Sequence, residues 1–157
     1  MTKHLNSTFL LLFCCLCANA ADFRLGIIGT DTSHVPTFTK EFNDPTAPGF
    51  VPGFHVVAAY KGGSPDIPDS ATRVDGFADQ VHSKYGVQIV PDIPTLLSMV
   101  DGVLLESGDG RRHLEQARLV IAAHKPLFID KPLASTLVDA REIARLAKDA
   151  GVPWFSS

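Results

Sequence analysis

Beyond residue 21 the chain alternates between short apolar runs and amphipathic segments, and this alternation limits the fold more than any other feature. Apolar runs typical of buried strands occupy residues 23–29, 54–60, 102–106 and 126–130, with a shorter piece around 87–90 and the start of another at 152–155. Between these runs, apolar residues recur every three or four positions, which is the spacing of one helix face. The four faces comprise Val35, Phe38 and Phe42; Val74, Phe77, Ala78, Val81 and Tyr85; Leu114, Ala117 and Ile121; and Leu137, Ala140, Ala144 and Ala147.

Strands that alternate with helices pair in parallel through right-handed crossovers. We therefore predict an α/β fold with a doubly wound parallel sheet, in three α/β/α layers, ending at about the sixth strand. The last helix also has start and stop signals, because Thr136 and Asp139 resemble a capping box and Gly151 precedes Pro153. Segments 45–53 and 62–68, which are rich in proline and glycine, are expected to be connecting loops.

The first twenty residues have the pattern of an export signal. Lys3 precedes an uncharged apolar run at residues 9–17, and Ala18-Asn19-Ala20 has the small residues that signal peptidase accepts. We expect residues 1–20 to be a Sec-type signal peptide, cut after Ala20, which leaves a domain at 21–157 that is exported and free of the membrane. The alternative is a membrane anchor, but the run is shorter than the roughly 20 apolar residues of a spanning helix.

Charge and cysteine content exclude several classes of function. With 14 basic and 17 acidic residues the formal net charge is −3, which offers no broad cationic surface for nucleic acid. The cysteines all lie in the apolar run, so the expected domain has no disulfide and no thiolate chemistry. A lipoprotein signal is disfavoured because Phe13 and Leu16, which precede Cys14 and Cys17, are too bulky for that motif.

In a doubly wound sheet the ligand site lies at the carboxyl ends of the strands, near the point where strand order reverses. Three turns are expected to meet there: 29–34, 107–113 and 130–132.

An ordered set of motifs resembles the Gfo/Idh/MocA family of glucose-fructose oxidoreductases and inositol dehydrogenases. The set comprises Asp101-Gly102-Val103-Leu104-Leu105, then His113 and Ala117, then the segment 124–134 with Asp130-Lys131-Pro132. The family hallmark is a strand that ends in Glu-Lys-Pro, which this chain keeps with an aspartate in place of the glutamate. The resemblance covers residues 22–157. It implies a Rossmann-like NAD(P)-binding domain, the amino-terminal part of an oxidoreductase that acts on a sugar-like or polyol-like small molecule.

The resemblance also implies roles for individual residues. Lys131 inherits the place beside the nicotinamide and substrate, where it transfers a proton or orients a hydroxyl group, and is the expected catalytic residue. Pro132 shapes the turn and is expected to have an unusual peptide geometry. His113 is expected to line the cofactor pocket, and Ser107 and Asp130 lie in turns of the same site.

The first turn departs from the dinucleotide fingerprint G-x-G-x-x-G. Gly29 and Thr30 begin it, but Asp31 and His34 stand where the second and third glycines belong. A carboxylate about 4 Å from a phosphate is repelled by roughly 4 kcal/mol per charge pair at an effective dielectric of about 20. Orthodox pyrophosphate binding is therefore doubtful here.

Two interpretations of this turn stay open. In one, Thr32 or Ser33 caps a helix that begins near Pro36, and His34 fills the space of the missing glycine. In the other, Asp31 and His34 join His113 and Lys131 in a polar site for a sugar-like ligand or an ion. Two histidines and one aspartate are weak grounds for a metal centre, so no metal site is predicted.

The end of the second strand bears on the cofactor. An acidic residue there would hold the ribose of NAD, but this chain has Lys61, followed by Ser64. Both suit a 2′-phosphate, so between NAD and NADP the sequence favours NADP slightly. The alternative is that Lys61 begins an exposed loop.

In the family an α+β domain follows the nucleotide-binding part and supplies the catalytic acid/base pair, much of the substrate pocket and the subunit contacts. We expect that domain to be absent from these 157 residues, so that the chain is not catalytically complete alone, and homo-oligomers to form through it in full-length relatives. The alternatives are a carbohydrate-binding module without redox function and an inactive fragment. The last strand is expected to be a frayed edge open to pairing.

Overall fold

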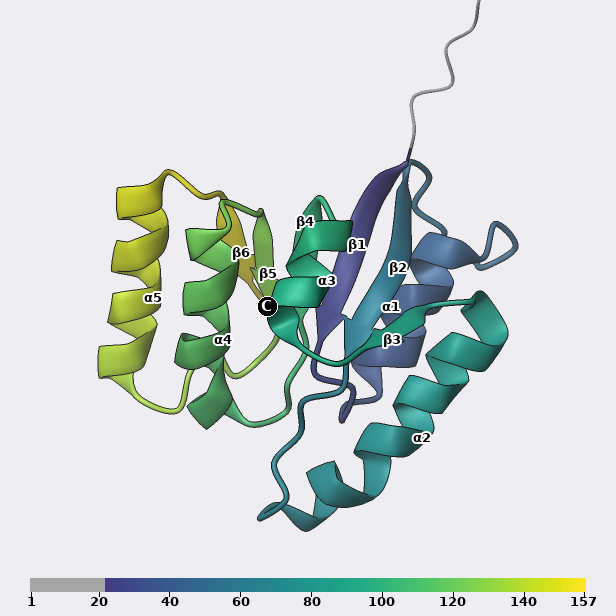
Figure 1. Ribbon diagram of the computed structural model, residues 1–157, viewed down its shortest axis with the longest axis horizontal. Helices are drawn as coiled ribbons and strands as arrows, with labels where there is room; N and C mark the ends of the chain where they lie inside the picture. Colours follow the sequence, from purple (N-terminus) through teal and green to yellow (C-terminus); the bar gives the residue numbers. More distant parts are fainter. Residues whose placement is uncertain (1–21) are drawn as a thin grey trace, which may run out of the picture.

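Six parallel strands form a single sheet in the computed structural model, which describes residues 22–157. The predicted signal peptide at 1–20 lies outside the described residues. In chain order the elements are β1 (Phe23–Ile28), α1 (His34–Asn43), β2 (Phe54–Tyr60), α2 (Pro68–Tyr85), β3 (Gln88–Val90), α3 (Ile93–Met99), β4 (Gly102–Leu105), α4 (Gly110–Ala122), β5 (Leu127–Ile129), α5 (Leu137–Ala150) and β6 (Trp154–Ser156). The strand order β3-β2-β1-β4-β5-β6 reverses between β1 and β4, as in a doubly wound sheet (Figure 1).

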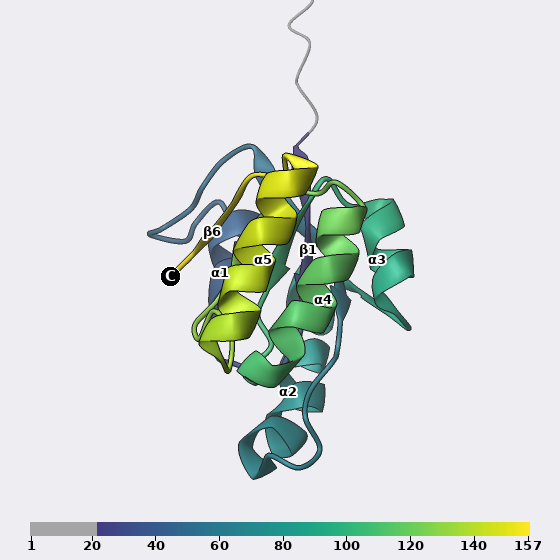
Figure 2. The same cartoon turned by 90° about the vertical axis from the view of Figure 1, so that its left-hand side faces the viewer.

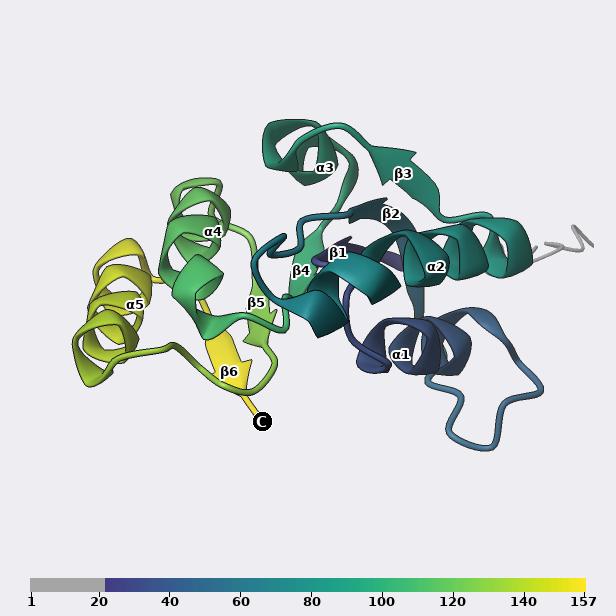
Figure 3. The ribbon, with the colours of Figure 1, turned by 90° about the horizontal axis from the view of Figure 1, so that it is seen from below.

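Helices cover both faces of the sheet, so the predicted three layers are confirmed. Helices α1 and α2 lie on one face and α3, α4 and α5 on the other (Figure 3). The latter three stand side by side (Figure 2). Each face has its own apolar core. The larger core includes Leu96, Leu105, Val120, Ile129 and Ile143, and the smaller includes Ile27, Val35, Val56 and Val81.

All six expected strands are present within two residues of their predicted bounds, and the four predicted helix faces became α1, α2, α4 and α5. Helix α5 begins at Thr136, whose Oγ1 accepts a hydrogen bond from the Asp139 amide at 3.1 Å, and it ends at Gly151 with φ +65°. The expected capping signals are thus confirmed. No helix among residues 22–157 has the length and apolar character that crossing a bilayer requires.

Two features of the helices differ from the sequence analysis. Helix α1 begins at His34 rather than near Pro36, and the Ser33 side chain makes no capping hydrogen bond. Helix α3 was not predicted, because its seven residues are too few to show helical periodicity. Its start is set by Asp92, which accepts a hydrogen bond from the Thr95 amide. The helix packs on β1 at Gly26, where a Cβ atom would come within 2.6 Å of Leu96.

Candidate functional site

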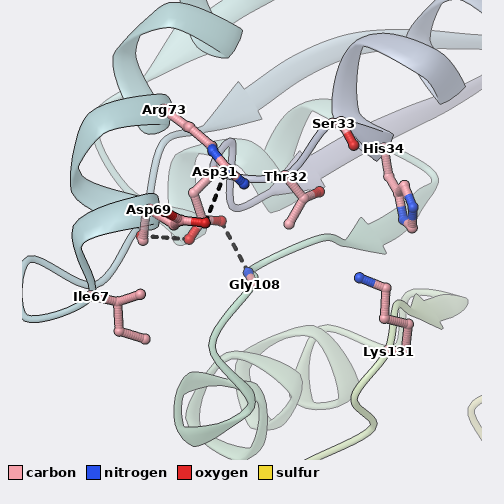
Figure 4. Close-up of a pocket in the computed structure, with 10 residues that line it drawn as sticks. Asp31, Thr32, Ser33, His34, Ile67, Asp69, Arg73, Gly108 and Lys131 are labelled. Carbon is pink, nitrogen blue, oxygen red and sulfur yellow. Dashed lines mark hydrogen bonds and ion pairs between the residues drawn. The ribbon is translucent and has the colours of Figure 1, made fainter.

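A polar pocket of about 260 Å³ opens at the carboxyl ends of the strands, where the strand order reverses (Figure 4). Its walls come from the turn after β1, the start of α2, the turn after β4 and the turn after β5. The lining residues are Asp31, Thr32, Ser33, His34, Ile67, Asp69, Ser70, Arg73, Gly108 and Lys131. The structure thus brings together the three turns that the sequence placed at one edge of the sheet.

Gly29 lets the first turn pass close to the turn after β4. Its φ is +91°, and a Cβ atom at this position would lie 2.4 Å from the backbone nitrogen of Ser107. The turn is also pinned to the end of β2, because the amides of Gly29 and Thr30 donate to the carbonyl oxygens of Tyr60 and Lys61. This glycine therefore keeps the tight-turn role that the fingerprint assigns to its first glycine.

Asp31 is buried and ties three segments together. Its Oδ2 accepts a hydrogen bond from Ser70 Oγ at the start of α2, and its Oδ1 accepts one from the Gly108 amide at 3.0 Å. Figure 4 shows both contacts as dashed lines at the centre of the pocket. The carboxylate predicted to repel a pyrophosphate is thus engaged by two protein donors.

Several groups that line the pocket suit an anion. Thr32 Oγ1 is buried and has no hydrogen-bond partner among the described residues. Ser33 leaves its hydroxyl free of helix capping, and the amino end of α1 carries the positive end of the helix dipole. Lys131 and Arg73 add two cationic side chains to the lining, and the guanidinium of Arg73 donates to Asp69 at 2.8 Å. An orphaned hydroxyl beside a helix amino terminus fits the phosphates of a dinucleotide, although the glycine fingerprint is incomplete.

Lys131 follows β5 and reaches into the pocket, where its side chain points into the space between Gly108 and His34 (Figure 4). The Lys131–Pro132 peptide bond is cis, which is the unusual geometry expected for Pro132. The residue is exposed, so a ligand in the pocket has access to its ammonium group.

The residues at the end of β2 already have protein partners. Lys61 Nζ donates to Asp75 at 2.8 Å, which raises the pKa of the lysine. Ser64 is buried, and its hydroxyl donates to Asp109 at 2.6 Å. The pKa of Asp109 is lowered, mainly by hydrogen bonds from Arg111, with Ser64 contributing less.

His113 lies outside the pocket lining and is fully buried in α4. Its Nε2 lies 2.6 Å from the carbonyl oxygen of Ser107, and its Nδ1 lies 3.2 Å from that of Leu133. The Ser107 hydroxyl donates to Gln116, one turn further along α4. In this structure His113 and Ser107 therefore hold the turns after β4 and β5 together, beneath the pocket.

A second polar group lies beside the pocket and includes a residue that the sequence analysis missed. Glu106, at the end of β4, is fully buried, and neither carboxylate oxygen has a hydrogen-bond partner among residues 22–157. Donor atoms of His34, Glu106 and Asp130 all lie within 4.8 Å of one another. Burial raises the pKa of Glu106 to about 8, with a further rise from Asp130 and an opposing effect of Lys131.

The sequence contained one signal for this residue. A glutamate directly after the fully buried strand Gly102–Leu105 is unusual, because a carboxyl group there enters the interior without an obvious partner.

Four of the predicted site residues line the pocket, and the others lie outside its lining. Asp31, Ser33, His34 and Lys131 line it directly. Asp130 contacts it through His34, with His34 Nδ1 2.7 Å from Asp130 Oδ2. The remaining predicted residues lie outside the lining: Gly29, Thr30, Lys61, Ser107, His113 and Pro132.

Comparison with known proteins gives one family. A family model described as an oxidoreductase family with an NAD-binding Rossmann fold, GFO_IDH_MocA, matches residues 23–156. The comparison with curated proteins gives no match.

Solved structures with the same fold include three enzymes. An oxidoreductase from Agrobacterium radiobacter, in complex with NAD+, L-tartaric acid and magnesium, has 19% identity and a TM-score of 0.67 over 87% of this chain and 35% of its own. The 3-ketoreductase KijD10 from Actinomadura kijaniata, in complex with TDP-benzene and NADP, has 20% identity and a TM-score of 0.65. The match covers 87% of this chain and 38% of KijD10. The WlbA dehydrogenase from Chromobacterium violaceum, in complex with NADH and UDP-GlcNAcA, has 14% identity and a TM-score of 0.68. The match covers 88% of this chain and 36% of the dehydrogenase. The chain thus spans little more than a third of each.

Proposed function

Because the chain belongs to the Gfo/Idh/MocA oxidoreductase family and forms its NAD-binding Rossmann fold, we propose that it is the cofactor-binding part of an exported oxidoreductase for a sugar-like or polyol-like substrate. A nicotinamide cofactor fits the family, and solved relatives hold NAD+, NADH or NADP. The observation that carries the proposal is the pocket at the reversal point, in which Lys131 faces the amino end of α1.

The residues of the pocket divide the work between binding and chemistry. The amino end of α1, the Thr32 hydroxyl and Arg73 hold the phosphates of the cofactor. Lys131 orients a substrate hydroxyl and exchanges a proton with it. When bound, the cofactor accepts or delivers the hydride. The acid/base pair that completes the reaction belongs to a second domain outside these residues.

The substrate class rests on the relatives and on the pocket. The complexes named above contain L-tartaric acid and a nucleotide-linked sugar acid, both rich in hydroxyl and carboxylate groups. The pocket of this chain offers hydroxyl, carboxylate and cationic side chains, which suit a polyhydroxy compound.

A fluorescence titration with NADH and NADPH tests the cofactor. We expect both to bind below 1 mM, with a slight preference for NADPH through Lys61. Lys61→Ala should abolish this preference, because it weakens NADPH binding by roughly two- to threefold through loss of a charge-assisted contact and leaves NADH binding unchanged. Asp75→Ala releases Lys61 from its 2.8 Å ion pair and should therefore increase the affinity for NADPH. Lys84→Ala, on an exposed lysine of α2, is the control.

Absence of binding of both cofactors at millimolar concentration would overturn the proposal for this chain and favour the carbohydrate-binding module. Export has a separate test. Expression of the full chain in a host with a Sec pathway should yield exported protein that begins at Ala21 by amino-terminal sequencing. Recovery of membrane-bound protein that still begins at Met1 would instead support the anchor.

A further inference from the structure

The cluster of His34, Glu106 and Asp130 is not used by the proposed oxidoreductase chemistry. The residues come from the start of α1 and from the ends of β4 and β5, far apart in the chain but adjacent across the sheet. Backbone hydrogen bonds fix the two carboxyl-bearing residues, since the Glu106 amide donates to Ile28 at 2.7 Å and the Asp130 amide donates to Leu105 at 2.9 Å. The cluster is therefore held on the rigid part of the fold.

The burial of Glu106 without a hydrogen-bond partner among the described residues indicates a bound ligand. Its side chain is completely buried, and both of its oxygens lack a hydrogen-bond partner among the described residues. A buried carboxyl group without a partner is costly, and native structures explain such groups by a catalytic role or by a bound water or ion. Asp130, which is 1% exposed, adds a second acid to the same space.

We propose that His34, Glu106 and Asp130 bind one divalent transition-metal cation. The three donor atoms lie within 4.8 Å of one another, and His34 Nδ1 and Asp130 Oδ2 are 2.7 Å apart. Tetrahedral ligands at about 2.1 Å from a zinc ion are about 3.4 Å apart, so small side-chain movements bring these donors into coordination.

The donor set indicates the class of cation. Two carboxylates balance the charge of a divalent ion, and an imidazole favours a transition metal over Mg²⁺ or Ca²⁺. Zn²⁺ and Mn²⁺ both accept one nitrogen and two oxygen ligands. Ser157 Oγ donates to Asp130 Oδ1 at 3.1 Å, which is the kind of outer contact that orients a ligating carboxylate.

The position of the site suggests what the cation contacts. His34 belongs to both the cluster and the pocket lining, so the cation adjoins the pocket near Lys131. Three protein ligands leave at least one coordination position of a four-coordinate ion open. A water molecule or a hydroxyl oxygen of a pocket ligand occupies that position. Metal binding itself does not depend on the proposed cofactor and can be measured without it.

The test uses the expected exported form, residues 21–157, which lacks the cysteines at 14, 15 and 17 that would bind zinc themselves. The protein is freed of metal with EDTA and then of the chelator. Isothermal titration calorimetry and native mass spectrometry with MnCl₂ or ZnSO₄ should show one ion per chain with micromolar or tighter affinity. Glu106→Gln and Asp130→Asn should each weaken binding by roughly 100-fold or more, since loss of outer contacts alone costs 10–100-fold. Glu115→Gln, on an exposed carboxylate of α4, is the matched control and should bind as the unchanged chain does.

Spectroscopy identifies the atoms that bind the ion, which a folding defect alone would not change. X-ray absorption at the zinc edge should show one imidazole nitrogen among oxygen ligands in the unchanged chain, and His34→Ala should remove that nitrogen while circular dichroism stays unchanged. No binding of either ion at 1 mM, or equal affinity in Glu106→Gln, would overturn the site.

Discussion

At the scale of single residues, the first turn keeps the first glycine of the dinucleotide fingerprint and lacks the other two. Asp31 replaces the glycine that normally faces the pyrophosphate, but its oxygens are engaged by Ser70 and by the Gly108 amide. Gly29, in contrast, is required by backbone geometry, since its φ is positive and Ser107 lies against it. The turn therefore combines a glycine that the backbone geometry requires with an aspartate that bonds to neighbouring segments.

Gly29→Ala should lower the free energy of unfolding by more than about 2 kcal/mol, because the new Cβ meets the Ser107 backbone and the φ of +91° is strained for alanine. Gly76→Ala is the matched control. Gly76 lies inside α2 with open space around its Cβ position, so alanine should stabilise the protein by up to about 1 kcal/mol. Urea denaturation followed by circular dichroism measures both, and equal effects would contradict the role given to Gly29.

Asp31→Ala should cost about 1–3 kcal/mol of stability, since the buried Ser70 hydroxyl and the Gly108 amide both lose their acceptor. Asp69→Ala, which removes an exposed ion pair with Arg73, should cost less than about 1 kcal/mol. Thermal and urea denaturation of the two variants provide the comparison. A cost for Asp31→Ala no larger than that of Asp69→Ala would show that the bridge between the turns contributes nothing.

At the scale of elements, the amino end of β1 is joined to the turn before β4 by an ion pair. Asp101 accepts hydrogen bonds from the Arg24 amide and guanidinium, at distances of 2.7–3.0 Å. Side-chain and backbone hydrogen bonds from Arg24 lower the pKa of Asp101 to about 2 from its ordinary value of 3.8. The contact thus reinforces the β1–β4 pairing at the reversal of strand order.

A depressed carboxyl pKa stabilises the fold only while the group is ionised. The contribution of Asp101 should be complete above about pH 4 and should vanish as the pH falls from 4 to 2. The unchanged chain should therefore be more stable than Asp101→Asn at pH 5, and the difference should shrink toward pH 2. Guanidinium denaturation at several pH values tests this. For the control Glu115→Gln, the difference in free energy of unfolding from the unchanged chain should stay constant with pH. A constant difference for Asp101→Asn would contradict the assignment.

At the scale of the whole molecule, the two apolar cores provide most of the buried contacts, whereas the edge strand β6 has a neighbouring strand on one side only. Strand β6 pairs with β5 alone among the described strands, and Phe155 is 67% exposed. Ile129, on the neighbouring strand, is completely buried. Within residues 22–157, β6 is therefore an edge strand of the sheet.

Ile129→Ala should destabilise the molecule by about 2–5 kcal/mol, because it leaves a cavity in the larger core. Phe155→Ala should change stability by less than about 1 kcal/mol, since most of the ring is in solvent. Thermal denaturation distinguishes the two, and hydrogen exchange should show faster exchange in β6 than in β4. Equal costs for the two variants would mean that the edge strand belongs to the folding core.

Local patterns were sufficient to predict most of the architecture. Periodicity and β-rich runs predicted all six strands and four helices, since each depends on residues close together in the chain. Helix α3 was missed because seven residues hold too little periodic information. For the site, the turns were predicted correctly, but Glu106 was taken for the end of a strand and its isolation in the interior was not visible.

The amino-acid order alone was enough to predict the doubly wound sheet, the edge at which the pocket lies and the family resemblance, because periodicity and motifs are local properties. Which side chains meet at that edge depended on the folded chain. Asp31 contacts Gly108 across 77 positions, and His34 contacts Asp130 across 96. Such contacts arise only when the strands are ordered and packed, since burial and partner are properties of the assembled sheet and not of any segment.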